Sequence, residues 1–179
     1  MKRSGFTLIE IVITIALVGI LLVLSFVSLE STMISSRDEE RKTDIETIAS
    51  YLESYYTTGS QYDTTVGQYP SLDPLNPLTD DNLTTNSNEL NLLRDVEPSV
   101  LVSPDADATT LSSIISATNN SQTVDNISPK PTTAQYVYQP IANDGSLCNN
   151  LATQTCRKFN LYYRTESGSA IKMVTSRHQ

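Results

Sequence analysis

The hydrophobic pattern of the chain begins with one long apolar segment. Between Phe6 and Val27 most residues are Ile, Leu, Val, Ala or Phe, and the only ionisable side chain is Glu10. About 20 helical residues, at roughly 1.5 Å each, span the hydrocarbon core of a bilayer. Residues 6–27 are therefore predicted to form a single transmembrane helix.

Residues 28–58 carry the pattern of an amphipathic continuation of this helix. Apolar side chains recur there at helical spacing: Ile45, Ile48, Ala49, Leu52, Tyr55 and Tyr56. Gly59 is a natural helix stop, so the helix would have about 50 residues and a length of roughly 75 Å. The polar stretch before the stripe pairs opposite charges at helical spacing, for instance Asp38 with Lys42. That stretch is either a solvated helix face or a contact between subunits.

Residues 59–134 are rich in Thr, Ser, Asn and Asp and are predicted to be a loop region with two short helices, at 89–95 and 109–116. A calcium site is conceivable here, because carboxylates are the oxygen ligands that Ca²⁺ prefers. The candidate ligands are Asp73, Asp80, Asp81, Asp105 and Asp107. Their spacing matches no calcium-loop signature, and Asp is also common in turns. We therefore predict no metal site from this pattern.

The last part of the chain, residues 135–179, has the pattern of antiparallel strands. Apolar and polar residues alternate from Phe159 to Arg164, and further strands are expected at 136–138 and 170–175. Such a small sheet has too little apolar surface to be stable alone and needs the helical stripe to complete a core. The predicted fold class is α+β, a long N-terminal helix packed on a small C-terminal antiparallel sheet.

The charge balance limits the possible partners. The chain has 12 Lys and Arg against 20 Asp and Glu, a net charge of -8, which argues against direct nucleic-acid binding by the domain. Lys2 and Arg3 precede the apolar segment and no block of positive charge follows it. By the positive-inside rule, residues 1–5 are cytoplasmic and the folded part lies outside.

The two cysteines, Cys148 and Cys156, are eight residues apart. In a domain outside the membrane, two such cysteines are predicted to form a disulfide. A metal site is disfavoured because the only histidine is His178. We find no constellation typical of an enzyme and no pattern that calls for a cofactor.

Glu10 needs a partner, because a carboxylate within a membrane segment costs several kcal/mol and marks a functional site. Gly5 precedes the apolar segment and lacks a Cβ atom, so a protease can approach the backbone closely. Cleavage between Gly5 and Phe6 would leave the apolar helix intact and create an ammonium group at Phe6. That ammonium is the candidate partner of Glu10.

The run Gly5-Phe6-Thr7-Leu8-Ile9-Glu10, after a short basic leader and before an apolar helix, resembles the prepilin motif of type IV pilins and type II secretion pseudopilins. The resemblance implies cleavage after Gly5 by a membrane aspartyl prepilin peptidase and N-methylation of Phe6. It also implies that Glu10 pairs with the N-terminus of a neighbouring subunit in a helical filament. The chain departs from many family members in lacking a proline near residue 24, which leaves Gly19 as the only helix breaker in the segment.

These features predict a structural subunit of a type IV pilus-like surface filament. The subunit would be held in the cytoplasmic membrane by a single span and then polymerised by an assembly machinery with its own ATPase. One alternative is a pseudopilin of a type II secretion or DNA-uptake system, the only setting in which nucleic acid is expected, indirectly. The other is a membrane-anchored binding domain that does not polymerise.

Overall fold

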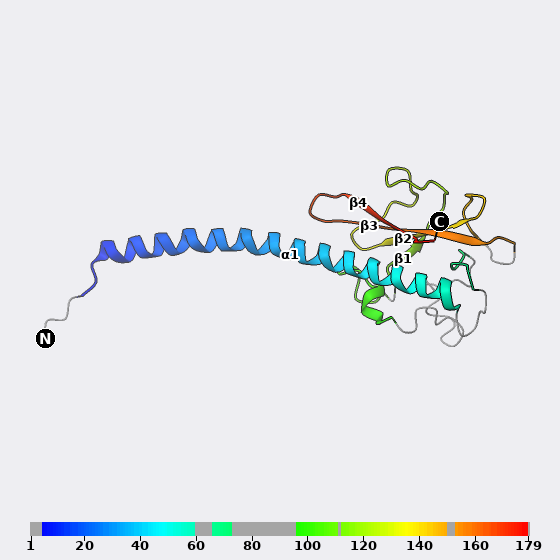
Figure 1. Ribbon diagram of the computed structural model, residues 1–179. Coiled ribbons are helices and arrows are strands. Elements are labelled where there is room, and N and C mark those ends of the chain that lie inside the picture. Colours follow the sequence, from blue (N-terminus) through cyan, green and yellow to red (C-terminus); the bar gives the residue numbers. More distant parts are fainter. Residues whose placement is uncertain (1–4, 60–65, 73–95, 111, 150–152, 179) are drawn as a thin grey trace. The chain divides into compact units, whose positions relative to one another are not determined.

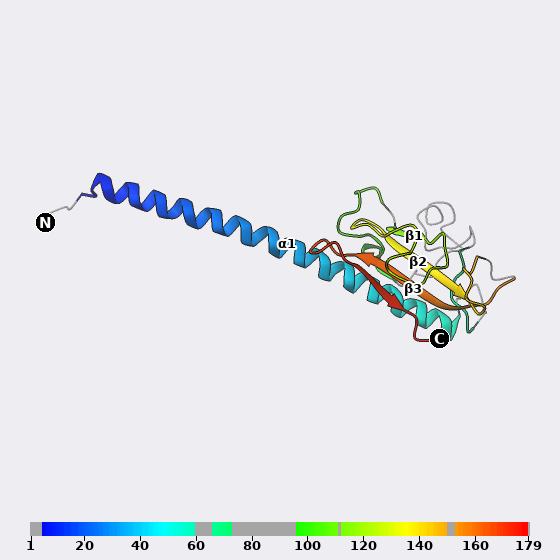
Figure 2. The same cartoon turned by 90° about the horizontal axis from the view of Figure 1, so that it is seen from above.

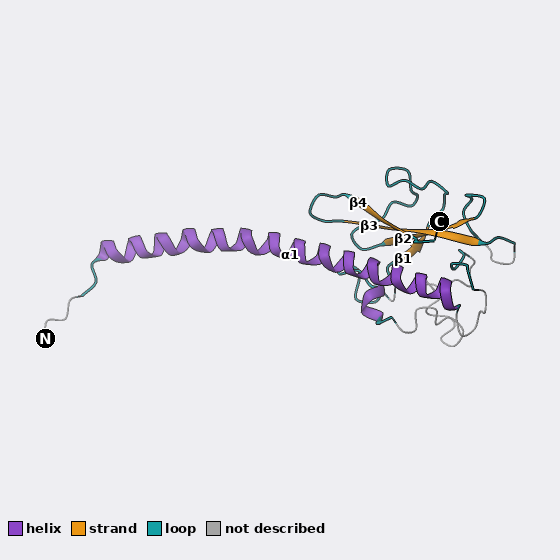
Figure 3. Cartoon of the chain, viewed as in Figure 1, coloured by secondary structure: helices purple, strands orange, loops and turns teal. Residues whose placement is uncertain are grey.

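The structure is a computed structural model that describes residues 5–59, 66–72, 96–110, 112–149 and 153–178. The chain divides into two compact units, residues 1–36 and residues 37–179. The helix α1 (Leu8–Thr58) has 51 residues and contributes to both units. Figure 3 shows this single long helix together with the strands and loops of the second unit.

In the first unit, α1 is helical throughout, including at Gly19. Its large apolar side chains from Leu8 to Leu24 are between 49% and 83% exposed. Two polar side chains within the segment are satisfied locally, because the hydroxyls of Thr14 and Ser25 donate to backbone carbonyls three and four residues earlier. The segment is therefore a regular helix with an apolar surface on all sides.

At its other end, α1 stops where the sequence predicts. Gly59 follows Thr58 with φ of 69°, and its N–H donates to Tyr55 O at 2.8 Å. A left-handed residue just past the last turn is a common helix C-cap, and glycine adopts it without steric cost.

The second unit contains a four-stranded sheet in the order β1-β2-β3-β4 (Figures 1 and 2). The strands are β1 (Ile114–Ser116), β2 (Tyr136–Ala142), β3 (Cys156–Arg164) and β4 (Ile171–Thr175). β2, β3 and β4 form the antiparallel meander expected from the sequence, with Leu161 opposite both Tyr138 and Val174. β1 is parallel to β2, so the sheet is mixed and not purely antiparallel.

The prediction of a helix at 109–116 is wrong, because Ile114–Ser116 forms the strand β1. Ile114 belongs to the core on the helix side of the sheet, whereas Ile115 packs on the opposite side. Adjacent apolar residues are typical of a strand that is buried on both faces, and a helix of this length has the same signature. A 3₁₀ helix, η2 (Pro98–Leu101), was not predicted, and the helix expected at 89–95 lies outside the described residues.

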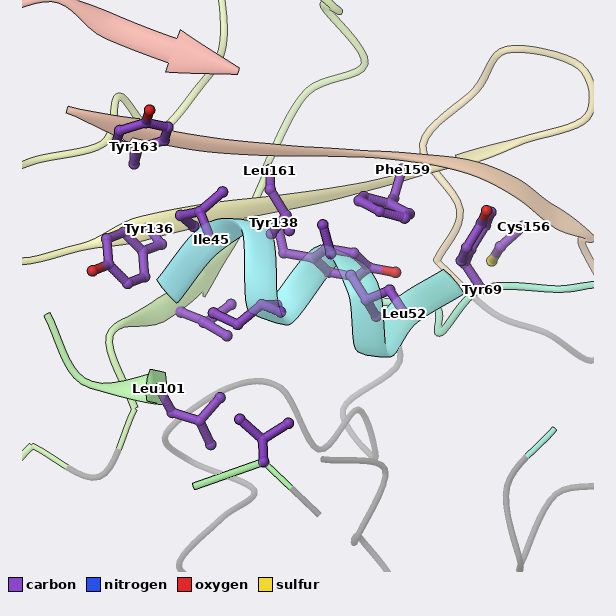
Figure 4. Packing of buried hydrophobic residues seen from close by; sticks show 14 of the residues in the cluster. Ile45, Leu52, Tyr69, Leu101, Tyr136, Tyr138, Cys156, Phe159, Leu161 and Tyr163 are labelled. Carbon is purple, nitrogen blue, oxygen red and sulfur yellow. The ribbon is translucent and has the colours of Figure 1, made fainter. Parts of the chain in front are cut away.

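The core lies between α1 and the inner face of the sheet (Figure 4). The predicted stripe is confirmed: Ile45, Ile48 and Leu52 are at most 1% exposed. Figure 4 shows the strand residues that pack against it, which include Tyr136, Tyr138, Phe159, Leu161 and Tyr163. The helix therefore supplies one wall of the core that the sheet cannot complete alone.

The opposite face of the sheet is covered as well, which the sequence did not indicate. Ala117 and Ile127, from the connection between β1 and β2, pack on Val137 and Tyr162. The buried Gln139 amide donates to the carbonyls of Asn119 and Ser121, both at 2.9 Å. As a result every residue of β2 is buried.

Candidate functional site

The residues of the proposed cleavage site precede α1. Gly5, Phe6 and Thr7 lie before the first helical residue, and Phe6 is 78% exposed. A Cβ atom placed on Gly5 would have no atom within 4 Å. The Gly5–Phe6 peptide is therefore accessible and outside the helix.

Thr7 and Glu10 form a capping box at the start of α1. The N–H and hydroxyl of Thr7 donate to Glu10 Oε2 at 3.4 and 3.5 Å, and the Glu10 N–H donates to Thr7 Oγ1 at 3.4 Å. Reciprocal bonds of this kind satisfy two backbone donors that the first helical turn leaves free. This role was not predicted from the sequence, although the signal, a Thr three residues before a Glu at the start of an apolar run, is present.

The capping box places the Glu10 carboxylate at the N-terminal turn of the helix. This position favours negative charge, because the free N–H groups of the first turn carry partial positive charge. Within residues 5–59 and the other described ranges, no basic side chain forms an ion pair with Glu10. The carboxylate is thus oriented by hydrogen bonds and has no cationic partner among the described side chains.

In the second unit, a cluster of charged side chains connects α1 to two loops, one before β1 and one between β3 and β4. Arg41 is fully buried and contacts Asp38 Oδ1 at 2.7 Å and Asp105 Oδ2 at 2.6 Å, and its Nε donates to Thr133 O at 2.9 Å. Arg37 holds the Glu166 carboxylate with two bonds of 2.9 and 2.6 Å. We refer to Arg37, Asp38, Arg41, Asp105 and Glu166 as the arginine cluster.

The pKa values within the arginine cluster follow from these contacts. Burial by itself would raise the pKa of Asp38, but hydrogen bonds from Ser167 and from the Glu166 backbone N–H hold it below its usual range. The hydrogen bond from Arg37 lowers the pKa of Glu166. Both carboxylates are therefore charged at neutral pH and retain their partners.

This cluster corrects one expected ion pair and gives the surroundings of one calcium candidate. Asp38 pairs with Arg41, and Lys42 pairs with Glu39 instead, at 2.9 Å. Asp105, one of the calcium candidates, is held by two guanidinium groups, which makes it unsuited to bind a cation. Asp73, Asp80 and Asp81 lie outside the described residues, and the described part of the chain contains no group of three or more potential metal ligands.

Asp44 is a buried carboxylate of a different kind. It accepts a hydrogen bond from Tyr136 Oη at 3.1 Å, and no ion pair to it is found in the part of the chain that the structure describes. Burial raises the pKa of Asp44 to about 6, against the opposing effect of the Tyr136 hydrogen bond. The same burial raises the pKa of Tyr136.

Cys148 and Cys156 form the disulfide expected from the sequence, and both are fully buried. The bridge anchors the segment at 66–72, because Tyr69 N–H donates to Cys156 O and Leu72 N–H donates to Cys148 O, both at 2.9 Å. Tyr69 in turn packs edge-on against Phe159, with ring centroids 4.8 Å apart. The disulfide therefore belongs to the core and connects a loop to the sheet.

Comparison with known proteins gives one match, at the N-terminus. Residues 1–26 match the family model of the prokaryotic N-terminal methylation motif. Neither the curated proteins nor the solved structures contain a match to the chain. The motif indicates a structural subunit that prepilin peptidase processes for a pilus or secretion assembly, and the apolar helix fits membrane anchoring before assembly.

The architecture agrees with this finding. A long N-terminal helix packed with a small four-stranded sheet is a pilin-like α+β arrangement. The chain thus carries, at residues 1–26, the prepilin signature of the type IV pilins and pseudopilins.

Proposed function

We propose that this protein is a structural subunit of a type IV pilus-like filament, cleaved between Gly5 and Phe6 and polymerised through α1. The observation that carries the proposal is the position of the methylation motif, which covers a helix with an apolar surface on every side. Lipid can cover such a surface in the membrane, and the same helices of other subunits can cover it in a filament.

Cleavage would supply the partner that Glu10 lacks. A new ammonium group would form at Phe6, and N-methylation would leave its positive charge in place. The Thr7–Glu10 capping box would hold the carboxylate at the turn where an incoming N-terminus has to bind. In this mechanism the Phe6 ammonium of one subunit pairs with Glu10 of a neighbour while the apolar helices pack side by side.

The free-energy cost of an unpaired charge favours assembly with both the Phe6 ammonium and the Glu10 carboxylate present. Leaving one member of a desolvated ion pair without the other typically costs about 3–5 kcal/mol. Such a cost recurs at every subunit of a filament, so a single missing charge should have a large effect on polymerisation. The same loss should have little effect on insertion of a single chain into the membrane.

The test compares three variants at the start of α1. Glu10→Gln can still form the capping box but has no charge, and Glu10→Leu has neither. Thr7→Val keeps the charge and loses the two hydrogen bonds of the box that involve the Thr7 hydroxyl. We expect all three to insert, both Glu10 variants to assemble poorly, and Thr7→Val to assemble better than either. The measurement is the amount of membrane-held protein against the amount of sheared surface filament. Normal filament from Glu10→Leu would refute the pairing of Glu10 with the Phe6 ammonium.

The processing step has its own test. N-terminal mass spectrometry of assembled protein should find a mature chain that begins with methylated Phe6. An intact Met1 in assembled filament would contradict the proposed cleavage. If processing occurs but no surface filament forms, the same chemistry serves a short periplasmic pseudopilus, which is the second candidate.

A further inference from the structure

Three basic side chains gather at one end of the sheet, where β3 begins and β4 ends. The register pairs Asn160 with Thr175, and a hydrogen bond from Ser176 N–H to Phe159 O at 2.9 Å continues the pairing. Lys158 and Arg177, the next residue of each segment, therefore lie at this end of the sheet. We refer to Arg157, Lys158 and Arg177 as the cationic end.

Arg157 belongs to this group through its contact with the end of α1. Its Nη1 lies 3.1 Å from Tyr56 Oη, and the His178 ring stacks on Tyr56 with centroids 4.2 Å apart. Arg157 and Arg177 are exposed, and Lys158 is partly exposed. Positively charged side chains therefore lie both at the start of β3 and just after the end of β4.

Among the described residues, two carboxylates of the adjoining segments already accept hydrogen bonds. Glu53 has a side chain only 13% exposed and accepts hydrogen bonds from the Arg177 N–H at 2.7 Å and from Tyr69 Oη at 3.0 Å. Asp144 accepts from the N–H and the hydroxyl of Ser146, at 2.9 and 2.6 Å. The three basic side chains make no ion pair within the described residues.

A surface of opposite charge lies beside the arginine cluster. Residues 96–128 contain no Lys or Arg, and Asp105 ties this segment to Arg41 of α1. Arg41 is fully buried and paired with Asp38 and Asp105, so its guanidinium group is not part of the surface. Three carboxylates on these two segments are exposed and form no ion pair in the described part of the chain: Glu40, which precedes Arg41 on α1, and Glu97 and Asp107 within residues 96–128. We refer to Glu40, Glu97 and Asp107 as the acidic surface.

We propose that the cationic end of one copy of this chain docks on the acidic surface of another copy in the filament. The proposal rests on the proposed function and adds the contact between the folded parts of two subunits. The chain has an excess of acidic residues, so the folded parts of two subunits would repel one another if they were packed in random orientations. Contact between two different surfaces is heterologous, and a heterologous contact that does not close generates an open helical array.

The experiment reverses each surface and then both together. The first variant is Lys158→Glu/Arg177→Glu, the second is Glu40→Arg/Asp107→Arg, and the third combines all four changes. A matched control, Lys130→Glu/Lys172→Glu, changes the net charge as much as the first variant at exposed sites outside both surfaces. Each variant is expressed as the full chain, and the yield of sheared filament is compared with that of membrane-held protein.

Each double reversal should lower the filament yield by about tenfold or more, because like charges brought together at an interface oppose association strongly. The fourfold variant should recover most of the loss, and the control should assemble like the wild type. Wild-type yields from both double reversals would overturn the contact, as would a fourfold variant no better than its parents. A loss confined to Lys158→Glu/Arg177→Glu would also overturn it, because the acidic surface would then not be the partner of the cationic end.

Cross-linking provides a second measurement that does not depend on yield. The two native cysteines are bonded to each other, so Arg177→Cys and Asp107→Cys in separate co-expressed chains introduce the only free thiols. A disulfide-linked dimer should form in filaments only when both chains are present, and its absence from normal filaments would overturn the contact. Failure of the wild-type chain to form any filament would instead refute the proposed function.

Discussion

Arg41 offers the most direct test of how the folded unit holds together. The Arg41→Met variant keeps much of the apolar stem of the side chain but removes the guanidinium group. That group contacts Asp38, Asp105 and the carbonyl of Thr133 at 2.7, 2.6 and 2.9 Å. The change would leave two carboxylates and one carbonyl without this donor.

The expected loss follows from the burial of these groups. Removing one partner of a buried ion pair typically costs about 3–5 kcal/mol. The side chains of Asp38 and Asp105 are 12% and 29% exposed, so water can partly replace the lost guanidinium. We therefore expect a loss near the lower limit, about 3 kcal/mol, which is a large fraction of the stability of an ordinary domain.

The assay is urea unfolding of the full chain in detergent micelles, followed by near-UV circular dichroism. The chain has nine tyrosines and no tryptophan, and several of those tyrosines lie in the core, so the signal reports tertiary packing there. Arg37→Met is the matched control, because its side chain is 31% exposed and it should cost less. Adding Asp38→Asn and Asp105→Asn to Arg41→Met should recover part of the loss, since the uncompensated charges are removed.

The result that refutes this reasoning is specific. If Arg41→Met costs no more than Arg37→Met, the burial of the Arg41 ion pairs does not increase their contribution to stability. The attachment of residues 103–105 to α1 would then depend on apolar packing, for example that of Leu101.

Three further predictions concern single positions. Because the pKa of Asp44 is raised, the folded state binds a proton between about pH 4 and pH 6 that the unfolded state has released, so the free energy of unfolding of the wild type should fall as the pH rises through this range. Asp44→Asn should remove this fall in urea titrations at several pH values, and an unchanged profile would count against the prediction. Cys148→Ser should lower the free energy of unfolding by about 2–3 kcal/mol in the chain-entropy model; free thiols in the non-reduced wild-type protein would contradict the disulfide. Gly67 has a φ of 88°, so Gly67→Ala should lower the free energy of unfolding by about 1–2 kcal/mol in the same assay. Gly168 has open space around it and no positive φ, so Gly168→Ala should cost little, and equal losses from the two variants would contradict the backbone argument.

The sequence alone determined the features that depend on local pattern. A long apolar run and a 3.6-residue stripe specify one helix from its first turn to the glycine at its end, because helical hydrogen bonds connect residues four apart. The alternation around Phe159 and Leu161 likewise specified the strands of the meander, and two lone cysteines in a domain predicted to lie outside the membrane specified the disulfide. The methylation motif is also local, a run of six residues before an apolar segment.

Only the tertiary structure decided which distant segments meet. The residues of β1 fit a helix and a strand equally well by their spacing, and the parallel pairing with β2, together with burial on both faces, selected the strand. Asp38 has a basic residue both three and four positions further along the helix. Its choice of Arg41 depends on Asp105, 64 residues away from Arg41, and on the turn at Glu166. Neither spacing nor composition encodes such contacts, because they form only when the whole domain has folded around the helix.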